Sequence, residues 1–137
     1  MAGSIEQGGS QTRGSKHLLH FLVRLPGPAE TVWPALTTPD GLAGWLTAAD
    51  VLEPRLGGAV TLRELGSGRV TAWDVERVAE YTLEGGEGRG RIRFHLEQDG
   101  LGRSVLRFTH EYRGEAVEEP RWRARFERLI ENLERSS

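Results

Sequence analysis

The sequence contains no cysteine, which excludes disulfide bonds, thiol catalysis and cysteine-ligated metals. It also lacks an apolar run near the roughly 20 residues of a membrane-spanning helix, and its first residues lack the apolar core of a signal peptide. Neither sign of charge dominates, because 18 basic and 20 acidic side chains are interspersed and give a formal net charge of −2. The basic residues therefore form no continuous stripe of the kind that nucleic-acid binding needs. We expect a cytoplasmic protein with no nucleic-acid partner and no membrane span.

The length of 137 residues suits one domain with a single core, and a hydrophobic fraction of 37% is typical of globular proteins. Residues 1–16 are rich in glycine, serine and glutamine, with Ile5 as their only large aliphatic side chain. Such a segment has little to bury. We therefore expect a disordered N-terminal tail over residues 1–16 and a folded domain over residues 17–137.

The folded part begins with one strand and two short helices. Apolar residues alternate over His17–Leu25, as they do in a half-buried strand. From Ala29 the period changes to that of a helix, which Thr37-Thr38-Pro39 ends. Asp40 can cap a second short helix, which carries Trp45. Two helices in succession thus follow the first strand.

The middle of the chain has the pattern of an antiparallel meander. The expected strands are Val51–Pro54, Ala59–Leu65, Arg69–Val78, Glu80–Leu83, Arg91–Glu97 and Ser104–Arg113. Gly66-Ser67-Gly68 and Asp99-Gly100 predict hairpin turns. A switch of apolar parity between Val70 and Trp73 indicates a bulge. The run Gly85–Gly90 lies between two expected strands and has no lysine, so it predicts a hairpin loop and no phosphate site.

The segment Pro120–Glu134 carries the clearest helical pattern. Its large apolar residues fall on one face: Trp122, Phe126, Leu129, Ile130 and Leu133. Charged residues, among them Arg121 and Arg125, fill the opposite face, which we expect to meet water. Burial of the apolar face is worth on the order of 10 kcal/mol at most. The order of elements predicts an α+β fold, in which a curved antiparallel sheet wraps around this long C-terminal helix.

Two segments carry a resemblance to a known family. Pro28–Pro39, with the sequence PAETVWPALTTP, and Leu42–Leu46, with the sequence LAGWL, resemble the opening of bacterial proteins similar to the chaperone (heat-shock protein) ATPase activator domain. Leu56–Gly58, Gly68–Val70 and Leu106–Glu111 are weaker matches. These proteins belong to the START-like (SRPBCC) helix-grip superfamily, whose double-proline turn is replaced here by Glu76-Arg77. The resemblance implies the helix-grip fold, with members that carry lipids, cyclise polyketides or bind chaperones.

A curved sheet that grips a helix predicts a cavity between them. We expect it to bind a small hydrophobic ligand, such as a lipid or a polyketide-like or aromatic molecule. The residues that we expect to contact this ligand are Trp45, Val60, Leu62, Phe94, Phe108, His110, Tyr112, Trp122, Phe126 and Ile130. For Trp33 we favour core packing. The strand positions of Glu64, Asp74 and Tyr81 leave their directions open.

His110 is the most informative polar residue, because it shares the strand parity of the apolar Phe108 and so should point inward. It is either a structural histidine or the acid–base group of a cyclase or dehydratase. No arrangement of a catalytic nucleophile or of paired carboxylates can be argued from spacing, and we assign no catalytic residue. His17 and His20 point to opposite faces of one strand, so we expect no metal site, and we expect no cofactor. A chaperone-interacting module is a third hypothesis, with a chaperone or other protein as partner.

Overall fold

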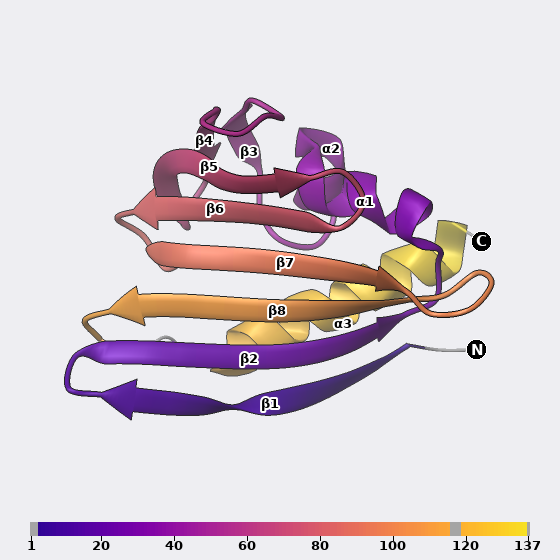
Figure 1. Cartoon of the computed structure of the whole chain (residues 1–137), viewed down its shortest axis with the longest axis horizontal. Helices are drawn as coiled ribbons and strands as arrows, with labels where there is room; N and C mark the ends of the chain where they lie inside the picture. The colour runs from indigo at the N-terminus through magenta and orange to yellow at the C-terminus, as the bar shows by residue number, and fades with distance from the viewer. Residues whose placement is uncertain (1–2, 116–118, 137) are drawn as a thin grey trace.

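The computed structural model describes residues 3–115 and 119–136, which form three helices and one eight-stranded sheet (Figure 1). The elements in chain order are β1 (Ser4–Arg13), β2 (Lys16–Leu25), α1 (Ala29–Thr37), α2 (Pro39–Ala43), β3 (Ala49–Leu52), β4 (Ala59–Leu62), β5 (Gly66–Asp74), β6 (Val78–Glu84), β7 (Gly90–Gln98), β8 (Ser104–Arg113) and α3 (Glu119–Ser136). The strand order is β1-β2-β8-β7-β6-β5-β4-β3, with every neighbouring pair antiparallel. Within the described residues, no helix is long and apolar enough to cross a membrane.

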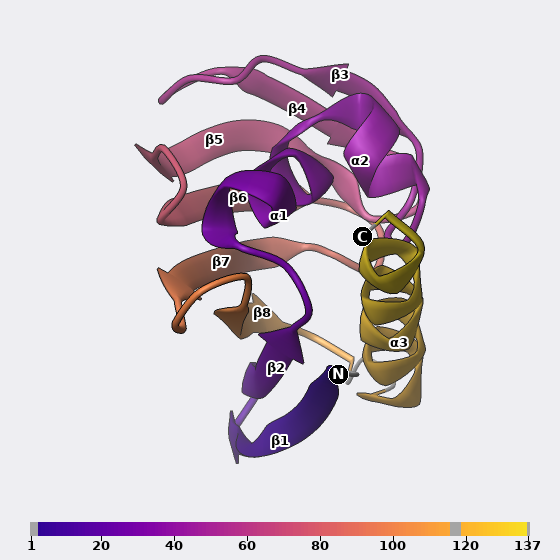
Figure 2. The ribbon, with the colours of Figure 1, turned by 90° about the vertical axis from the view of Figure 1, so that its right-hand side faces the viewer.

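The sheet curves strongly, and all three helices lie on its concave side (Figure 2). α3 runs along the inside of the curve, near β2 and β1, while α1 and α2 cover the part of the sheet nearer β3 and β4. The predicted α+β helix-grip architecture is therefore confirmed.

The prediction of a disordered tail over residues 1–16 is wrong for the described part, because Ser4–Arg13 forms the edge strand β1. Met1 and Ala2 lie outside the described residues. β1 pairs with β2 through the backbone, so it needs little apolar surface of its own, and only Ile5 packs against the core. Its register shifts between Gln7 and Gly9. The polar, glycine-rich composition conceals a strand because an edge strand depends on main-chain hydrogen bonds.

The predicted glycine turn between β4 and β5 is also wrong. Arg63–Leu65 makes the turn, with Glu64 in the left-handed region at φ 69°, and Leu65 is fully buried. Gly68 instead lies within β5, where a Cβ atom would fall 1.8 Å from the carbonyl oxygen of Thr82 on β6. Glycine is needed there for close approach of two strands rather than for a turn.

The expected strand Arg69–Val78 is two strands joined by a tight turn. β5 ends at Asp74 and β6 begins at Val78, with Glu76 at φ 64° between them. The predicted bulge is confirmed, because the pairing of β5 with β6 shifts register between Val70 and Ala72. This shift turns Val70 and the more distant Trp73 toward the same side.

The second short helix begins earlier than predicted. Thr38 caps α2, since its Oγ1 atom accepts a hydrogen bond of 3.0 Å from the backbone N–H of Gly41. Asp40 lies inside the first turn, and Trp45 follows the helix rather than belonging to it. Thr38 is the N-cap in place of Asp40 because it is the last extended residue before Pro39, and proline suits the first helical position.

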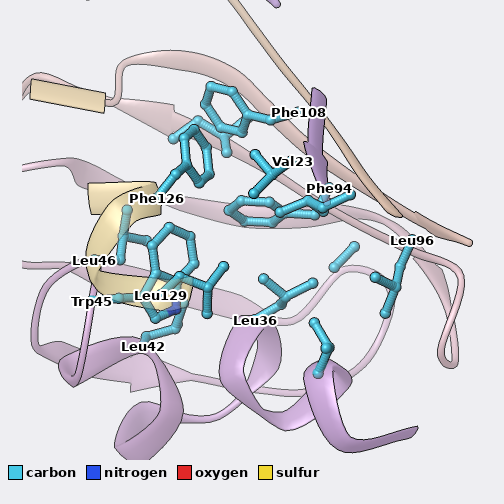
Figure 3. Close-up of a cluster of buried hydrophobic side chains, with 14 of the residues drawn as sticks. Val23, Leu36, Leu42, Trp45, Leu46, Phe94, Leu96, Phe108, Phe126 and Leu129 are labelled. Carbon is cyan, nitrogen blue, oxygen red and sulfur yellow. The ribbon is translucent and has the colours of Figure 1, made fainter. Parts of the chain in front are cut away.

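Phe126 of α3 lies at the centre of the core (Figure 3). Its ring centroid is 5.3 Å from that of Phe21, 5.0 Å from that of Phe108 and 5.6 Å from that of Trp45. These partners come from β2, β8 and the segment after α2. One helical side chain therefore joins the sheet to the α2 region, and all five apolar residues predicted for this face of α3 are buried.

Replacing Phe126 with alanine should therefore lower the free energy of unfolding by about 3 to 5 kcal/mol, since a large buried ring is lost and its cavity cannot fully collapse. Glu127 is exposed on the same helix, and Glu127→Ala should change the free energy of unfolding by less than about 0.5 kcal/mol. Urea unfolding followed by circular dichroism measures both. Equal losses in the two variants would contradict a core organised around Phe126.

Candidate functional site

The candidate site lies where α3 begins, at the end of the sheet that also carries the β6–β7 loop and the last residues of β8. His110 projects from β8 into the interior and is fully buried, as its strand parity predicts. Trp122 and Arg125 lie on the first turns of α3, one turn apart, and are 0% and 9% exposed. The site thus combines a strand, a helix and a loop that are far apart in the sequence.

Aromatic rings surround the imidazole of His110. The ring of Tyr112 stacks on it at 4.4 Å between centroids, and the indole of Trp122 meets it edge-on at 5.6 Å. The guanidinium carbon of Arg125 lies 4.9 Å from the centre of the Trp122 ring, within the range of a cation–π contact. His110, Trp122 and Arg125 are therefore immediate neighbours, and we call them the polar cluster.

Each member of the polar cluster has one buried polar atom with no hydrogen-bond partner among the described residues: Nδ1 of His110, Nε1 of Trp122 and Nη1 of Arg125. The other nitrogen of the imidazole, Nε2, lies 2.8 Å from the carbonyl oxygen of Arg89. A carbonyl only accepts, so this contact assigns the hydrogen to Nε2 and leaves Nδ1 as an acceptor. The cluster therefore offers one acceptor and two donors.

Burial controls the charge of these groups. Loss of water lowers the pKa of His110 from its ordinary 6.5 to about 4, and the nearby Arg89 and Arg125 cations act in the same direction, against the backbone contacts with Arg89 and Gly88 that raise it. His110 is thus neutral at pH 7. Burial also lowers the pKa of Arg125, helped by Arg121 and Arg128, but a guanidinium stays protonated near neutrality.

The β6–β7 loop closes over the polar cluster. Glu87 in this loop forms ion pairs with Arg121 and, at 3.4 Å, with Arg125. The backbone N–H groups of Glu87 and Gly88 donate to the carbonyls of Glu64 and Leu65. Gly86 has φ 65°, and a Cβ atom there would fall 2.5 Å from the Leu65 carbonyl carbon, so glycine is needed for this close approach. The loop is thus held to the β4–β5 turn by backbone hydrogen bonds and to α3 by the Glu87 carboxylate.

Outside this end of the sheet lies a surface hollow of about 370 Å³. Tyr112 and Arg89 line it, with Lys16 and Arg113 also at its rim. Arg89 stands over the Tyr112 ring and donates to the carbonyls of Arg113 and Glu115. Tyr112 and Arg89 thus separate the hollow from His110, which lies directly behind both.

The ten residues predicted to contact a ligand all lie in the interior, from 0% to 7% exposed. His110, Tyr112, Trp122 and Phe108 gather at the polar cluster. Trp45, by contrast, packs between Phe126 and Phe94 and donates to the Ala35 carbonyl. Val60 and Leu62 belong to β4, near the opposite edge of the sheet, beside the edge strand β3. The structure thus gathers part of the predicted set at one place and leaves the rest in the aromatic core.

The structure also places the residues whose side-chain directions the sequence left open. The hydroxyl of Tyr81 is buried and donates to the Leu36 carbonyl at 2.9 Å. Glu64 lies in a turn, and Asp74 lines a second surface hollow of about 970 Å³ at the opposite end of the sheet, near Val75. Trp33 packs edge-on against Trp73, as expected for a core residue. In residues 3–115 and 119–136, no group of three or more histidine or acidic side chains is arranged to hold a metal ion.

The sequence reasoning missed three residues of the site. Arg125 was expected on the water-facing side of the helix, but it lies at the border of the apolar stripe, one turn after Trp122, where the sheet and loop cover it. Glu87 and Arg89 were read only as parts of a glycine-rich hairpin. Spacing alone gives no signal for either, because their role depends on where the loop folds relative to α3.

A curved antiparallel sheet that wraps around a long C-terminal helix is the helix-grip fold of the START-like superfamily. Within it, the chain belongs to the family of Activator of Hsp90 ATPase homolog 1-like proteins (AHSA1), whose family model matches residues 26–135. No curated protein sequence is significantly similar to the chain.

Solved structures share the fold at low sequence identity. CalU16 from Micromonospora echinospora superposes with a TM-score of 0.72 at 18% identity, over 95% of this chain and 84% of its own. The Aha1 protein from Colwellia psychrerythraea, solved as a dimer, gives a TM-score of 0.70 at 23% identity, over 85% and 96% of the two chains. DynU16, from the dynemicin biosynthetic locus, gives 0.67 at 16% identity, over 88% of this chain and 48% of its own. Identities this low establish the fold alone.

The low pKa of His110 predicts a pH-dependent stability. In the unfolded chain a histidine titrates near 6.5, and His110 in the folded chain titrates near 4, so the unfolded state binds the extra proton between these values. The contribution of the neutral His110 to the free energy of unfolding is fully present above about pH 6.5. It is lost as the pH falls toward 4, and the total loss is roughly 3 kcal/mol. The wild type should lose about this much more than His110→Gln over that range, measured by urea unfolding. Parallel pH curves for the two proteins would refute a buried neutral histidine.

Proposed function

We propose that this chain binds a small, largely apolar molecule between the curved sheet and α3, beside the polar cluster. The observation that carries the proposal is the set of three buried polar atoms that have no hydrogen-bond partner in the described part of the chain and lie in aromatic surroundings. Small-molecule sites are commonly mainly apolar, with a few convergent polar groups that orient the ligand. Buried groups that lack partners are rare, and each calls for an explanation.

The β6–β7 loop provides a route of access at low cost. Among the described residues, Glu87 joins the loop to α3 through its ion pairs with Arg121 and Arg125, and its side chain is 32% exposed. Partly exposed ion pairs contribute about 0 to 1 kcal/mol. Loss of these ion pairs would therefore free the α3 side of the loop at little cost, while the backbone hydrogen bonds of Glu87 and Gly88 and the hydrogen bonds of Arg89 would hold its other side. Of the ten predicted ligand contacts, those at this end form the proposed site: Phe108, His110, Tyr112 and Trp122, joined by Arg125.

Binding is favoured over a cyclase or dehydratase reaction at His110. A general base works best when its pKa lies near the operating pH, whereas burial lowers the pKa of His110 to about 4. Its Nε2 hydrogen is also engaged by the Arg89 carbonyl. The imidazole is therefore suited to orient a ligand hydrogen and poorly suited to remove a proton.

The family description favours a second candidate function, a module that interacts with a chaperone ATPase. Such a module would use its outer surface, and compounds that fill the interior would leave the interaction unchanged. Binding assays with a purified Hsp90-type chaperone, with and without an interior ligand, separate the two candidates.

A ligand at the proposed site should be detected at one tryptophan. Of the four tryptophans, Trp122 alone has a buried indole N–H that lacks a partner among the described residues. In two-dimensional NMR spectra, apolar aromatic compounds should shift the indole N–H signal of Trp122, assigned by Trp122→Phe, and should leave that of Trp33 unchanged. The same compounds should raise the free energy of unfolding by about 2.7 kcal/mol at a hundredfold excess over the dissociation constant.

Trp33→Phe serves as the matched control, because Trp33 packs against Trp73 at a distance from the polar cluster. It should leave ligand affinity unchanged, whereas Trp122→Phe should weaken it. If no compound of a broad apolar library shifts the indole N–H signal of any tryptophan, the proposed function is overturned. Shifts confined to Trp33 would move the site to the other end of the sheet.

A further inference from the structure

The polar cluster specifies more about its ligand than apolarity. Nδ1 of His110 can only accept a hydrogen bond, because Nε2 carries the hydrogen that faces the Arg89 carbonyl. Nε1 of Trp122 and Nη1 of Arg125 can only donate. A complementary ligand therefore presents one donor toward β8 and an acceptor group toward α3.

The charges around the cluster favour an acceptor group that is an anion. Arg125 carries a positive charge in the interior, with Arg121 and Arg128 on the same helix close enough to repel it and Arg89 across from it beside His110. Glu87 is the carboxylate that pairs with Arg125, and it also pairs with Arg121, while Glu64 offsets part of the remaining charge. Hydrogen bonds between a guanidinium and a carboxylate are about twice as strong as neutral ones.

The aromatic side chains around the polar cluster favour a ligand that carries a flat ring. Tyr112 and Trp122 present their rings to His110 from two sides, and Phe108 lies 4.7 Å from Trp122 between centroids. Offset stacking between rings contributes about 0.5 to 1.5 kcal/mol beyond the area buried. An aromatic ligand that enters beside the cluster gains this contribution from each of these rings that it contacts.

We infer that the ligand is an aromatic acid that also carries a hydroxyl group: the hydroxyl donates to Nδ1 of His110, and the carboxylate accepts from Nε1 of Trp122 and Nη1 of Arg125. The inference rests on the proposed function and names its ligand class. Glu87 contacts Nη2 of Arg125, so the ligand carboxylate at Nη1 and the Glu87 carboxylate share one guanidinium, and Glu87 also keeps its contact with Arg121.

The test uses the full chain and four probes of similar size: para-hydroxycinnamate, its para-methoxy analogue, its methyl ester and the methyl ester of the methoxy analogue. The methoxy group removes the donor, and the ester removes the charge. At pH 7, calorimetry should give para-hydroxycinnamate an affinity about tenfold or more above each singly altered probe. The methoxy analogue lacks the hydrogen bond of the hydroxyl group, and the methyl ester lacks the charged hydrogen bond of the carboxylate.

Variants assign each preference to its residue. Arg125→Met should abolish the preference for the acid over the ester, and His110→Phe should abolish the preference for hydroxy over methoxy. Glu87→Gln should increase the acid-to-ester ratio of affinities, because it removes a negative charge that repels the ligand carboxylate across the Arg125 guanidinium. Glu127→Gln, an exposed glutamate of α3, is the matched control and should leave the ratio unchanged.

The outcomes separate the inference from the proposed function. If the four probes bind alike, or if only uncharged compounds of the apolar library bind, the inference fails and the proposed function stands. If no probe and no library compound binds, both fail. The comparison of probes needs only the wild-type protein, so it decides the inference even if Arg125→Met fails to fold.

Discussion

The fold depends on the contact between the apolar face of α3 and the concave side of the sheet. Phe126 is the focus of that contact, because its ring touches Phe21, Trp45, Phe108 and Trp122 at centroid distances from 5.0 to 6.3 Å. These partners come from β2, β8, α3 and the segment after α2, so a single helix face joins two neighbouring strands of the sheet to the α2 region. In a close-packed interior such a face fixes the position of everything attached to the helix.

The same contact draws polar side chains inward. With Phe126 in the core, Trp122 lies one turn earlier against Phe108 and His110, and Arg125 lies over the Trp122 ring. The guanidinium of Arg125 then reaches Glu87 in the β6–β7 loop rather than water. The polar cluster is thus a consequence of how the apolar stripe docks, and the loop is positioned by that cluster as well as by its backbone bonds to Glu64 and Leu65.

Much of the architecture could be predicted from periodicity, since α3, the inward direction of His110 and the bulge in β5 each follow from spacing along one element. What escaped prediction depends on contacts between elements. β1 is a strand because β2 offers it a backbone partner, although its own composition predicts disorder. Glu64 and Glu76 occupy left-handed turn positions where glycine would be expected, so the first turn was predicted too late in the chain and the second was not predicted.

The proposed site shows the same limit in a sharper form. A helical projection places Arg125 at the edge of the apolar stripe, and its burial is decided by the curvature of the sheet and by the glycine-rich loop, neither of which the helix encodes.

Each buried polar group without a partner costs about 1 to 3 kcal/mol, and apolar side chains of similar shape would remove that cost. A chain optimised for stability alone would place such side chains at 110, 122 and 125. Departures from local consistency are expected at functional positions, where stability is given up for chemistry. The three departures of this core adjoin one another, under one loop and beside one aromatic wall. Their concentration at one end of α3, while the rest of the helix packs through apolar contacts, is the physical reason to assign ligand recognition to that end.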